Sequence, residues 1–283
     1  MTPARVWWSA VRPATLAASV APVLTGTAIA TQQGGVRWWA GAGALIIGLA
    51  IQLGVNFAND YSDFVRGADS QRVGPVRAAS SGVVAPGQVR TAAVAAFGVA
   101  GLAGLILSLA IDPRLLVVGA ACLLAGWLYT GGPRPYGYLG FGELFVFVFF
   151  GLVATAGTVY LETSRVPVLA WQMAAAMGFL ATAILVLNNL RDIDTDAAAG
   201  KRTLATRMGR VRTRIFLTVT VALAFAAAIW AGAWLPVGAA VPAAVSLRIA
   251  WQSNAAPELV RALKLMAATE VVYALLFALG TLL

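Results

Sequence analysis

The chain has 283 residues, of which 60% are hydrophobic and 11% are charged, with a mean hydropathy of +0.82. A soluble domain carries about 25% charged residues, so this composition excludes an ordinary soluble protein and indicates an integral membrane protein. The net charge of +9 and the pI near 10.6 would suit nucleic acid. In a membrane protein, however, basic residues mark the cytoplasmic loops, so we expect no nucleic-acid partner.

Two residue types limit the chemistry. Cys122 is the single cysteine and lies in an apolar segment, so no disulfide can form within the chain. Histidine is absent, which removes the usual proton shuttle at neutral pH and the commonest transition-metal ligand. A metal site would therefore consist of oxygen ligands, the kind that Mg2+ prefers. The N-terminal residues lack the apolar core and cleavage site of a signal peptide.

Apolar segments of about 20 residues, the length that crosses a bilayer, follow one another along the chain. They predict an all-α membrane protein with nine transmembrane helices in a bundle. The weakest boundary separates the seventh and eighth spans, at residues 233–238, and the eighth span is short. The predicted spans are residues 13–31, 38–59, 91–111, 114–131, 140–161, 167–190, 213–233, 235–251 and 264–283.

The basic residues predict the orientation of these spans. If the N-terminus is cytoplasmic, only Arg37, Arg114 and Arg165 of the 20 Lys and Arg residues fall on the outer side. The other 17 fall on the inner side, as the positive-inside rule requires. The sequence therefore predicts a cytoplasmic N-terminus and an outer C-terminus.

Two predicted spans, the second and the sixth, end in similar polar motifs. The first motif is "NFANDYSDFVRGAD" (56–69), and the second is "NNLRDIDTDAAAGKRTLATRMG" (188–209). In each, an asparagine precedes an aspartate by four residues: Asn56 precedes Asp60, and Asn188 precedes Asp192. We interpret this as an internal repeat of two four-helix halves plus one extra helix.

The spacing places the acids of each motif on one face of a continued helix. Asp60 and Asp63 follow their asparagine by four and seven residues, and Asp192 and Asp196 follow theirs by four and eight. Clustered carboxylates repel one another, so each cluster needs a cation. Mg2+ is usually held by one or two carboxylates plus substrate phosphates. Two such clusters facing each other would hold a diphosphate between magnesium ions.

Basic residues follow both motifs: Arg72 and Arg77 the first, Lys201 and Arg202 the second. They would supply cations for the remaining phosphate oxygens. The alternative is that the acids only pair with loop arginines at the membrane surface. Two matching motifs on the same side make a functional site the better interpretation, because ionisable groups at membrane depth are usually functional.

Other candidates are less specific. Arg12, before Pro13, either starts a helix or faces a cavity. Glu143, at the cytoplasmic end of the fifth span, is a better cavity candidate than Glu162 at its outer end. The aromatic run 143–150 is expected to face lipid or to pack against other helices.

The Gly/Pro-rich loop "YTGGPRPYGYLG" (129–140) is either a plain turn or a binding surface. It carries Tyr129, Arg134 and Tyr138. Arg134 is one candidate partner for a substrate carboxylate, and Arg12 is the other. Tyr129, Phe141 or Phe145 would supply an aromatic wall if they line a cavity.

In these motifs the chain resembles the UbiA superfamily of intramembrane aromatic prenyltransferases. Within it, the segments "GPVRAASSG", "GPRPYGYLGFGELFVFVFFG" and "NNLRDIDTDAAAGKRTLATRMG" look most like the 1,4-dihydroxy-2-naphthoate polyprenyltransferases of menaquinone biosynthesis. The resemblance extends from "RPATLAASVAPVLTGTA" to the ninth span, and the second motif is its most specific part.

The resemblance implies one transmembrane prenyltransferase domain over residues 1–283, multi-pass in a bacterial plasma membrane. Its cavity would open laterally to lipid, with the active site near the cytoplasmic face. One departure is that Asp69 follows Asp63 by six residues, where relatives often have an acid after four. The implied Mg2+-binding catalytic residues are Asp60, Asp63, Asp192 and Asp196; the implied diphosphate-binding residues are Asn56, Asn188, Arg72, Arg77, Lys201 and Arg202.

The implied reaction transfers a polyprenyl group from an allylic diphosphate to 1,4-dihydroxy-2-naphthoate, with decarboxylation, giving demethylmenaquinone. The first alternative is a sibling enzyme acting on 4-hydroxybenzoate, homogentisate or haem. A cation transporter is a different class, which the acids disfavour because they gather at one face and not at the midplane. The residues expected to contact the acceptor are Arg12, Tyr129, Arg134, Tyr138 and Glu143.

Overall fold

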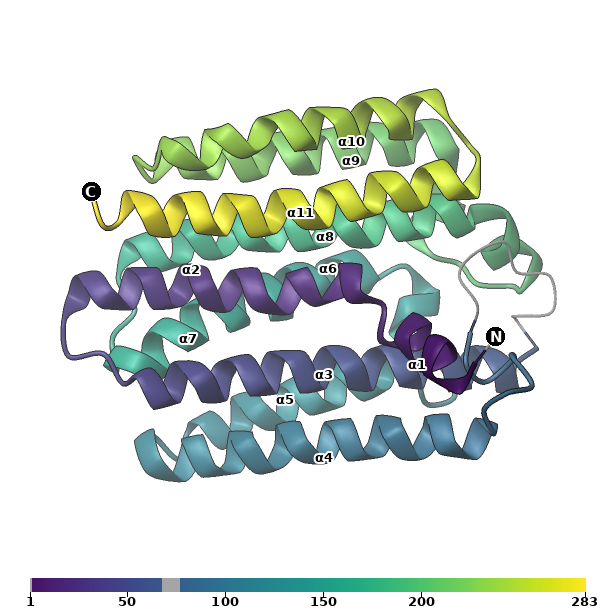
Figure 1. Ribbon diagram of the computed structural model, residues 1–283, viewed down its shortest axis with the longest axis horizontal. Helices are drawn as coiled ribbons and strands as arrows, with labels where there is room; N and C mark the ends of the chain where they lie inside the picture. Colours follow the sequence, from purple (N-terminus) through teal and green to yellow (C-terminus); the bar gives the residue numbers. More distant parts are fainter. Residues whose placement is uncertain (1, 68–76) are drawn as a thin grey trace.

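The computed structural model describes residues 2–67 and 77–283. Within these ranges all regular structure is helical, and the helices run lengthwise in a single bundle whose termini lie at opposite ends (Figure 1). The elements are α1 (Pro3–Val11), a 3-10 helix (Pro13–Leu16), α2 (Ala17–Gln33), α3 (Trp38–Val65), α4 (Pro86–Ile111), α5 (Leu115–Leu128), a 3-10 helix (Tyr136–Leu139), α6 (Gly142–Val146), a π-helix (Phe147–Val153), α7 (Ala154–Thr163), α8 (Val168–Ala198), α9 (Leu204–Trp230), a 3-10 helix (Leu235–Ala239), α10 (Ala240–Gln252) and α11 (Ala256–Gly280). Asp69 and Arg72 lie outside the described residues.

Each of the predicted spans contains helix, which confirms the all-α membrane fold class. Within the described residues, seven helical segments are long and apolar enough to cross a membrane. The other two predicted spans contain shorter helices, α5 with 14 residues and α10 with 13. Both motif helices extend beyond their predicted spans, to Val65 and Ala198, so Asp60, Asp63, Asp192 and Asp196 all lie in helix.

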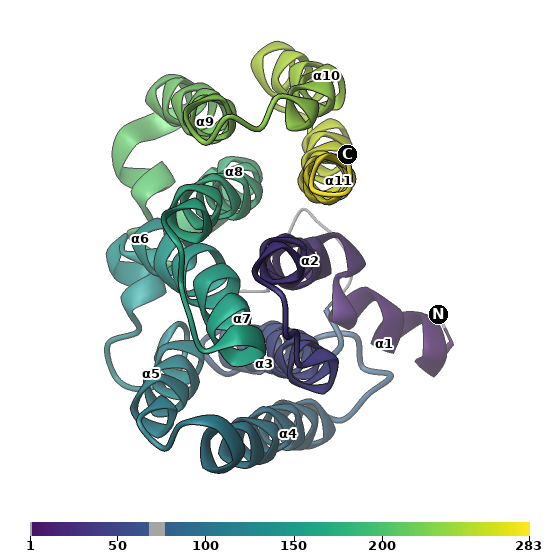
Figure 2. The same cartoon turned by 90° about the vertical axis from the view of Figure 1, so that its left-hand side faces the viewer.

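The two motif helices hold equivalent places in the bundle. Seen along its axis, α3, α4 and α5 lie on one side and α8, α9 and α10 on the other, with α2 and α7 between them (Figure 2). Among the described helices, α3 packs most extensively against α4, and α8 does so against α9. The C-terminal ends of α3 and α8 lie at the same end of the bundle (Figure 1), so the two motifs are neighbours.

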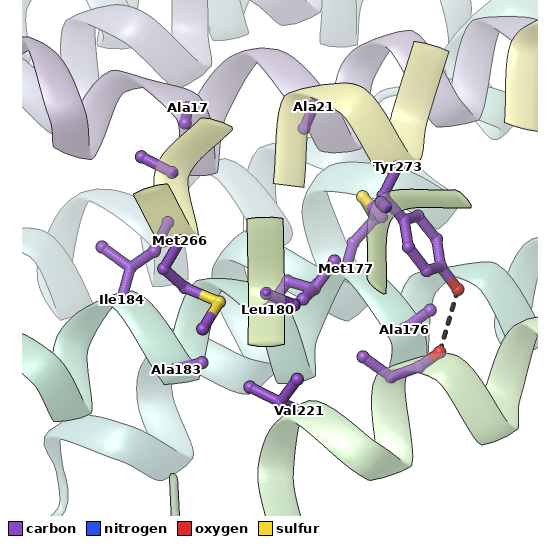
Figure 3. Packing of buried hydrophobic residues seen from close by; sticks show 14 of the residues in the cluster. Ala17, Ala21, Ala176, Met177, Leu180, Ala183, Ile184, Val221, Met266 and Tyr273 are labelled. Atoms are coloured by element: carbon purple, nitrogen blue, oxygen red, sulfur yellow. Dashed lines mark hydrogen bonds between the residues drawn. The ribbon is translucent and has the colours of Figure 1, made fainter. Parts of the chain in front are cut away.

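The core consists of small and flexible apolar side chains. Met177, Leu180 and Met266 are fully buried between α8, α9 and α11, with alanines around them (Figure 3). Small side chains let membrane helices approach closely. Tyr273, also fully buried, donates its hydroxyl to the carbonyl oxygen of Ala224 at 2.9 Å (Figure 3), which satisfies a polar group in a site without water.

The fifth span is not one regular helix, because a π-helix of seven residues lies between α6 and α7. Here Gly151 faces Gly178 of α8 so closely that a Cβ atom on Gly151 would lie 2.3 Å from the Gly178 Cα. A Cβ atom on Gly178 would lie 2.8 Å from the Phe147 carbonyl oxygen. The two glycines therefore set the distance between α8 and the π-helix. π-Helices are frequent at functional sites.

We expect the substitution Gly178→Ala to destabilise the bundle by about 1–3 kcal/mol, because the added methyl group overlaps the backbone of the π-helix. Thermal unfolding of the detergent-solubilised protein measures the change. Gly98→Ala is the matched control: Gly98 also lies in a helix, but a Cβ there meets no neighbouring atom within 4 Å. Equal melting temperatures for the two variants would contradict the packing argument.

Candidate active site

The ends of α3 and α8 meet around one lysine side chain. Lys201 Nζ lies 2.7 Å from Asp63 Oδ1 and 3.5 Å from Asp196 Oδ1. It also lies 4.8 Å from the centre of the Tyr138 ring. Both carboxylates are buried, with 2% and 9% of their residue surfaces exposed. The lysine therefore connects the two motifs, as the predicted facing clusters require.

Among the described residues, Asp63 has three partners. Its Oδ2 accepts a hydrogen bond of 2.9 Å from Arg77, which is itself buried. Its Oδ1 accepts from the Tyr138 hydroxyl and contacts Lys201. Burial and the neighbouring Asp63 carboxylate raise the pKa of Tyr138 above its ordinary value, so its hydroxyl remains a donor at neutral pH. The predicted residues Asp63, Arg77, Tyr138 and Lys201 thus form one connected cluster.

Asp60 lies one turn earlier on α3 and is fully buried. Its two oxygens accept hydrogen bonds from the backbone N–H groups of Ala78, at 2.8 Å, and Ala79, at 3.2 Å. These two hydrogen bonds hold the loop residues after Arg77 against α3. Each of its oxygens retains a second lone pair, so the carboxylate can hold this loop and accept a further partner.

In the second motif, the acids have local partners. Asp192 Oδ1 accepts from Arg191 Nε at 2.7 Å, and the same arginine donates to Asn188 Oδ1 at 2.8 Å. Asp194, in contrast, points outward: its side chain is 80% exposed and pairs with Arg210 at 2.6 Å. Asp194 therefore does not share the buried face of Asp192 and Asp196.

Among the described residues, no three His, Cys, Asp or Glu side chains converge in a geometry that could hold a metal ion. The predicted ligands Asp60, Asp63, Asp192 and Asp196 are instead engaged with the backbone, Lys201 and arginines. The donor set nevertheless fits a hard cation, because it consists of oxygens. A further oxygen beside this set, Oδ1 of Asn59, is buried and has no hydrogen-bond partner among the described residues.

The sequence interpretation missed Asn59. Asn59 is the fourth residue of "NFAND" and precedes Asp63 by four residues, so the same spacing that selected Asn56 also selects Asn59. In the structure, Asn56 binds the N-terminal segment: its Nδ2 donates to the Val11 carbonyl at 2.8 Å, and its Oδ1 accepts from Gln52 at 3.1 Å. Asn59 is therefore the better-placed amide oxygen for a ligand. Arg191 was also missed, since nothing in the spacing marks a residue beside Asp192.

A cavity of about 490 Å³ begins at this end of the bundle and extends between the helices. Arg12, Asn56, Asn59, Tyr129 and Asn188 line its polar end. The rest is apolar and is formed by side chains of α2, α3, α4, α5, the fifth span and α8. On α3 the lining runs from Asn59 to Ala44, which corresponds to about 22 Å along the helix axis.

The aromatic run of the fifth span faces this cavity. Phe145, Phe149 and Phe150 are lining residues, so the expectation that the run faces lipid or only packs is wrong for these three. Tyr136 stacks on Phe145 with ring centres 4.0 Å apart and donates to the Ala125 carbonyl at 2.8 Å. Phe145 and Phe149 are four residues apart and so lie on one face of the span, and Phe150 is adjacent to Phe149.

The predicted acceptor residues separate into two groups. Arg12 and Tyr129 line the cavity, and Arg12 has a left-handed backbone conformation with φ 52°. A non-glycine residue held in this region is strained, which is common at ligand sites. Arg134 is exposed and Glu143 is buried against Asn189, 2.9 Å away, and neither lies among the described lining residues.

The remaining predicted residues also have defined places. Arg202 has an exposed side chain, and its backbone N–H donates to the Tyr138 carbonyl at 3.0 Å. Phe141 is 52% exposed and is absent from the described cavity lining. Glu162, at the outer end of the fifth span, is fully buried and accepts from Thr27 at 2.9 Å.

The site thus combines buried carboxylates and cations, on the same helix ends as Asn59 and Asn188, with the polar end of a long, mostly apolar cavity. Such an arrangement suits a substrate with a highly charged head and a hydrocarbon tail. The carboxylates and an amide oxygen can hold divalent cations, and Lys201 and Arg77 can face phosphate oxygens. The apolar walls keep water from a reactive intermediate. The fold and the site define an intramembrane transferase of prenyl groups.

Comparison with known proteins agrees with this class. Residues 19–278 match the UbiA prenyltransferase family, and the chain belongs to this family. It is 50% identical to a 1,4-dihydroxy-2-naphthoate octaprenyltransferase of Mycobacterium tuberculosis over 77% of this chain and 75% of that protein. It is 38% identical to the Escherichia coli protein of the same name over 74% of this chain and 70% of the relative.

Solved structures share the fold. A UbiA homologue from Aeropyrum pernix superposes with a TM-score of 0.68 at 13% identity, covering 96% of this chain and 97% of that one. A homologue from Archaeoglobus fulgidus bound to DMAPP and Mg2+ gives a TM-score of 0.65 at 14% identity, covering 96% of this chain and 99% of that one. At these identities the likeness establishes the fold alone.

We expect Lys201→Met to lower the stability of the protein in the presence of a chelator by about 1–3 kcal/mol. The substitution leaves two buried carboxylates, Asp63 and Asp196, without the cation that they share. Arg202→Met is the matched control, because the neighbouring side chain is exposed. Thermal unfolding in detergent compares the two, and an equal loss in both variants would show that the bridge does not stabilise the fold.

Proposed function

We propose that this protein transfers a polyprenyl group from an allylic diphosphate to 1,4-dihydroxy-2-naphthoate, with loss of carbon dioxide, and so makes demethylmenaquinone in menaquinone biosynthesis. The observation that carries the proposal is the Lys201 bridge between Asp63 and Asp196, on the two helices whose Asn59 and Asn188 line the polar end of a cavity of about 490 Å³. The names of the relatives in Mycobacterium tuberculosis and Escherichia coli support the same acceptor.

The charged end of the site binds the diphosphate. Asp60, Asp63, Asp192 and Asp196, with the unpartnered oxygen of Asn59, are the residues that would hold Mg2+. Bound Mg2+ would neutralise the diphosphate and stabilise it as a leaving group. When carboxylate charge is taken up in this way, Lys201 and Arg77 are able to face phosphate oxygens. Arg72 and Arg202 remain candidates for the same role.

The chemistry needs no covalent enzyme intermediate. The allylic carbon–oxygen bond breaks, and its electron pair leaves with the diphosphate. The ring carbon that carries the acceptor's carboxylate attacks the allylic cation, and carbon dioxide then departs, leaving its bonding electrons in the ring to restore aromaticity. Phe145, Phe149 and Phe150 surround the hydrocarbon, exclude water and present aromatic faces, which favour a nearby cation.

The acceptor binds beside Arg12 in this proposal. Arg12 lines the cavity together with Tyr129 and Tyr136, so a carboxylate and a ring can be bound at one place. Arg134 is exposed, so we favour Arg12 as the partner of the acceptor's carboxylate. Tyr138 and Glu143 support the site indirectly, through Asp63 and Asn189 respectively.

The proposal includes the topology. The single prenyltransferase domain, residues 1–283, would cross a bacterial plasma membrane nine times, with α5 and α10 completing the seven longer spans. An odd number of crossings agrees with termini at opposite ends of the bundle (Figure 1). Because 17 of the 20 basic residues then lie on one side, the N-terminus and the diphosphate site would face the cytoplasm.

A sibling prenyltransferase using 4-hydroxybenzoate is the second candidate, since the geometry of the cavity does not exclude a single ring. A transporter is less well supported. The carboxylates lie at one end of the bundle, next to a cavity with apolar walls, whereas transport sites lie near the midplane. Release of pyrophosphate from a prenyl diphosphate would separate an enzyme from a transporter.

We expect Asp192→Asn to lower prenyl transfer by about a thousandfold or more, because a lost metal-binding charge removes several kcal/mol of transition-state stabilisation. Asp194→Asn is the matched control. It removes a carboxylate two residues away on the same helix that is exposed and paired with Arg210, and we expect activity within about threefold of wild type. The measurement is prenylated product formed at increasing Mg2+ by purified protein in lipid. Near-normal turnover by Asp192→Asn at saturating Mg2+ would assign the second motif a structural role.

We expect the protein to prefer 1,4-dihydroxy-2-naphthoate over 4-hydroxybenzoate by about tenfold or more in kcat/KM. The fused ring adds buried apolar area worth about 1–3 kcal/mol. Competition between the two acceptors, with mass analysis of the lipid products, measures the ratio. Equal prenylation of 4-hydroxybenzoate, with its carboxyl group retained, would favour the sibling enzyme.

A further inference from the structure

A cluster that the proposed reaction does not use lies beside the outer end of the cavity. Tyr160 of α7 donates its hydroxyl to Asp112 Oδ2 at 2.6 Å. Asp112 follows the last residue of α4 and lies in the turn before α5. Arg114 binds the same carboxylate through Nε, at 3.0 and 3.1 Å, and through its backbone N–H, at 2.9 Å. These bonds hold the pKa of Asp112 below its ordinary value, so it stays a charged acceptor.

This contact joins α7 to the turn before α5. The helix packs against α3 and α4, while the cavity lies between it and the fifth span, whose Phe149 and Val153 line the other side. At the inner end, Tyr136 donates to the Ala125 carbonyl at 2.8 Å. At the outer end, Tyr160 donates to Asp112 at 2.6 Å. Two tyrosine hydroxyls thus connect the fifth span and its preceding loop to the two ends of α5.

The lining residues place the outer bond at the far end of the cavity. Leu115 and Leu116 follow Asp112 in the chain, and Leu161 follows Tyr160; all three line the cavity. Leu116 is also 40% exposed, and Ala120 is both a lining residue and exposed. The cavity therefore reaches the outer surface of the bundle along α5, next to the Tyr160–Asp112 bond.

The length of the cavity limits how much of a prenyl chain it can hold. One isoprene unit adds four chain bonds of about 1.5 Å, or about 5 Å when extended. The cavity, about 22 Å along α3, accommodates about four units. A chain of eight units, the length in the names of the relatives, spans about 40 Å. Its distal half must therefore leave the cavity where α5 and α7 meet the lipid.

We propose that Tyr160 and Asp112 form a latch that fixes α5 against α7 where the distal part of a long prenyl chain leaves the cavity. They are positioning residues for donors longer than about four isoprene units, and shorter donors do not depend on them. The proposal rests on the proposed function and identifies the part of the fold that distinguishes long from short donors.

The test compares KM for geranyl diphosphate (two units) and octaprenyl diphosphate (eight units) in lipid nanodiscs. For Tyr160→Phe we expect KM to rise about fivefold or more with the octaprenyl donor and to stay within twofold with the geranyl donor, with kcat within twofold for both. Asp112→Asn retains an oxygen that accepts the Tyr160 hydroxyl, so it should behave like wild type. Tyr273→Phe removes a tyrosine hydrogen bond of 2.9 Å in the core, away from the cavity lining, and should leave both values unchanged.

An equal change in KM for the two donors, or no change for the octaprenyl donor, would overturn the latch. A second measurement needs no turnover: the rise in melting temperature caused by each donor reports its binding. In Tyr160→Phe, the stabilisation by octaprenyl diphosphate should fall toward that by geranyl diphosphate. If wild-type protein transferred neither group, the proposed function would fail, and this difference would still decide the latch: a fall would support it, and an unchanged difference would overturn it.

Discussion

Four buried carboxylates at one end of a membrane protein repel one another, and the arrangement of cations around them is the constraint on which the site depends. Lys201 lies between Asp63 and Asp196, Arg77 contacts Asp63, and Arg191 contacts Asp192. Arg191 belongs to α8 itself, but Lys201 and Arg77 lie in the loops after α8 and α3, so these two loops must fold back onto the helix ends. In an interior of low polarity an unpaired charge would be very costly, and this cost keeps the loops in place.

The same constraint explains how the polar and apolar parts of the protein are joined. Asp60 binds the backbone of the loop after α3, and Asn56 binds the segment before α2. Through these contacts the end of α3 orients Arg12 and the Lys201 cluster around one opening. Farther from this opening the cavity walls are apolar. The charged end of the site thus corresponds to the diphosphate head of a prenyl diphosphate, and the apolar walls correspond to its hydrocarbon tail. Head and tail of such a substrate are therefore bound by different physical forces in adjacent parts of one site.

Much of the fold followed from local patterns. Apolar segments of the right length predicted the helices, and the shared face predicted from the spacing of asparagine and aspartate required helices that continue into the motifs, as α3 and α8 do. Contacts between residues far apart in the sequence could not be predicted from these local patterns. Nothing near Lys201 in the sequence indicates that it faces Asp63, and Asp192 pairs with an adjacent arginine that has no helical spacing to mark it. The phenylalanines of the fifth span were expected to face lipid or to pack, because an aromatic run in a membrane span is more often lipid-facing than part of a cavity, whereas Phe145, Phe149 and Phe150 line the cavity. Asn59 could have been predicted as a site residue, because it precedes Asp63 by four residues, the same spacing that separates Asn56 from Asp60.

The π-helix also couples the two ends of the cavity. Residues before it, such as Phe145, face the catalytic end, and Tyr160 after it reaches Asp112 at the outer end. One extra residue in a helical turn rotates everything beyond it by about 100° relative to an uninterrupted α-helix. Deleting one residue within Phe147–Val153 would restore a regular helix, but then only one of the two ends could keep its orientation. The number of residues in the π-helix is therefore fixed by the orientation of both ends of the cavity. Homologous chains that bind both ends of a long substrate in this way should keep this number of residues, while the identity of the residues varies.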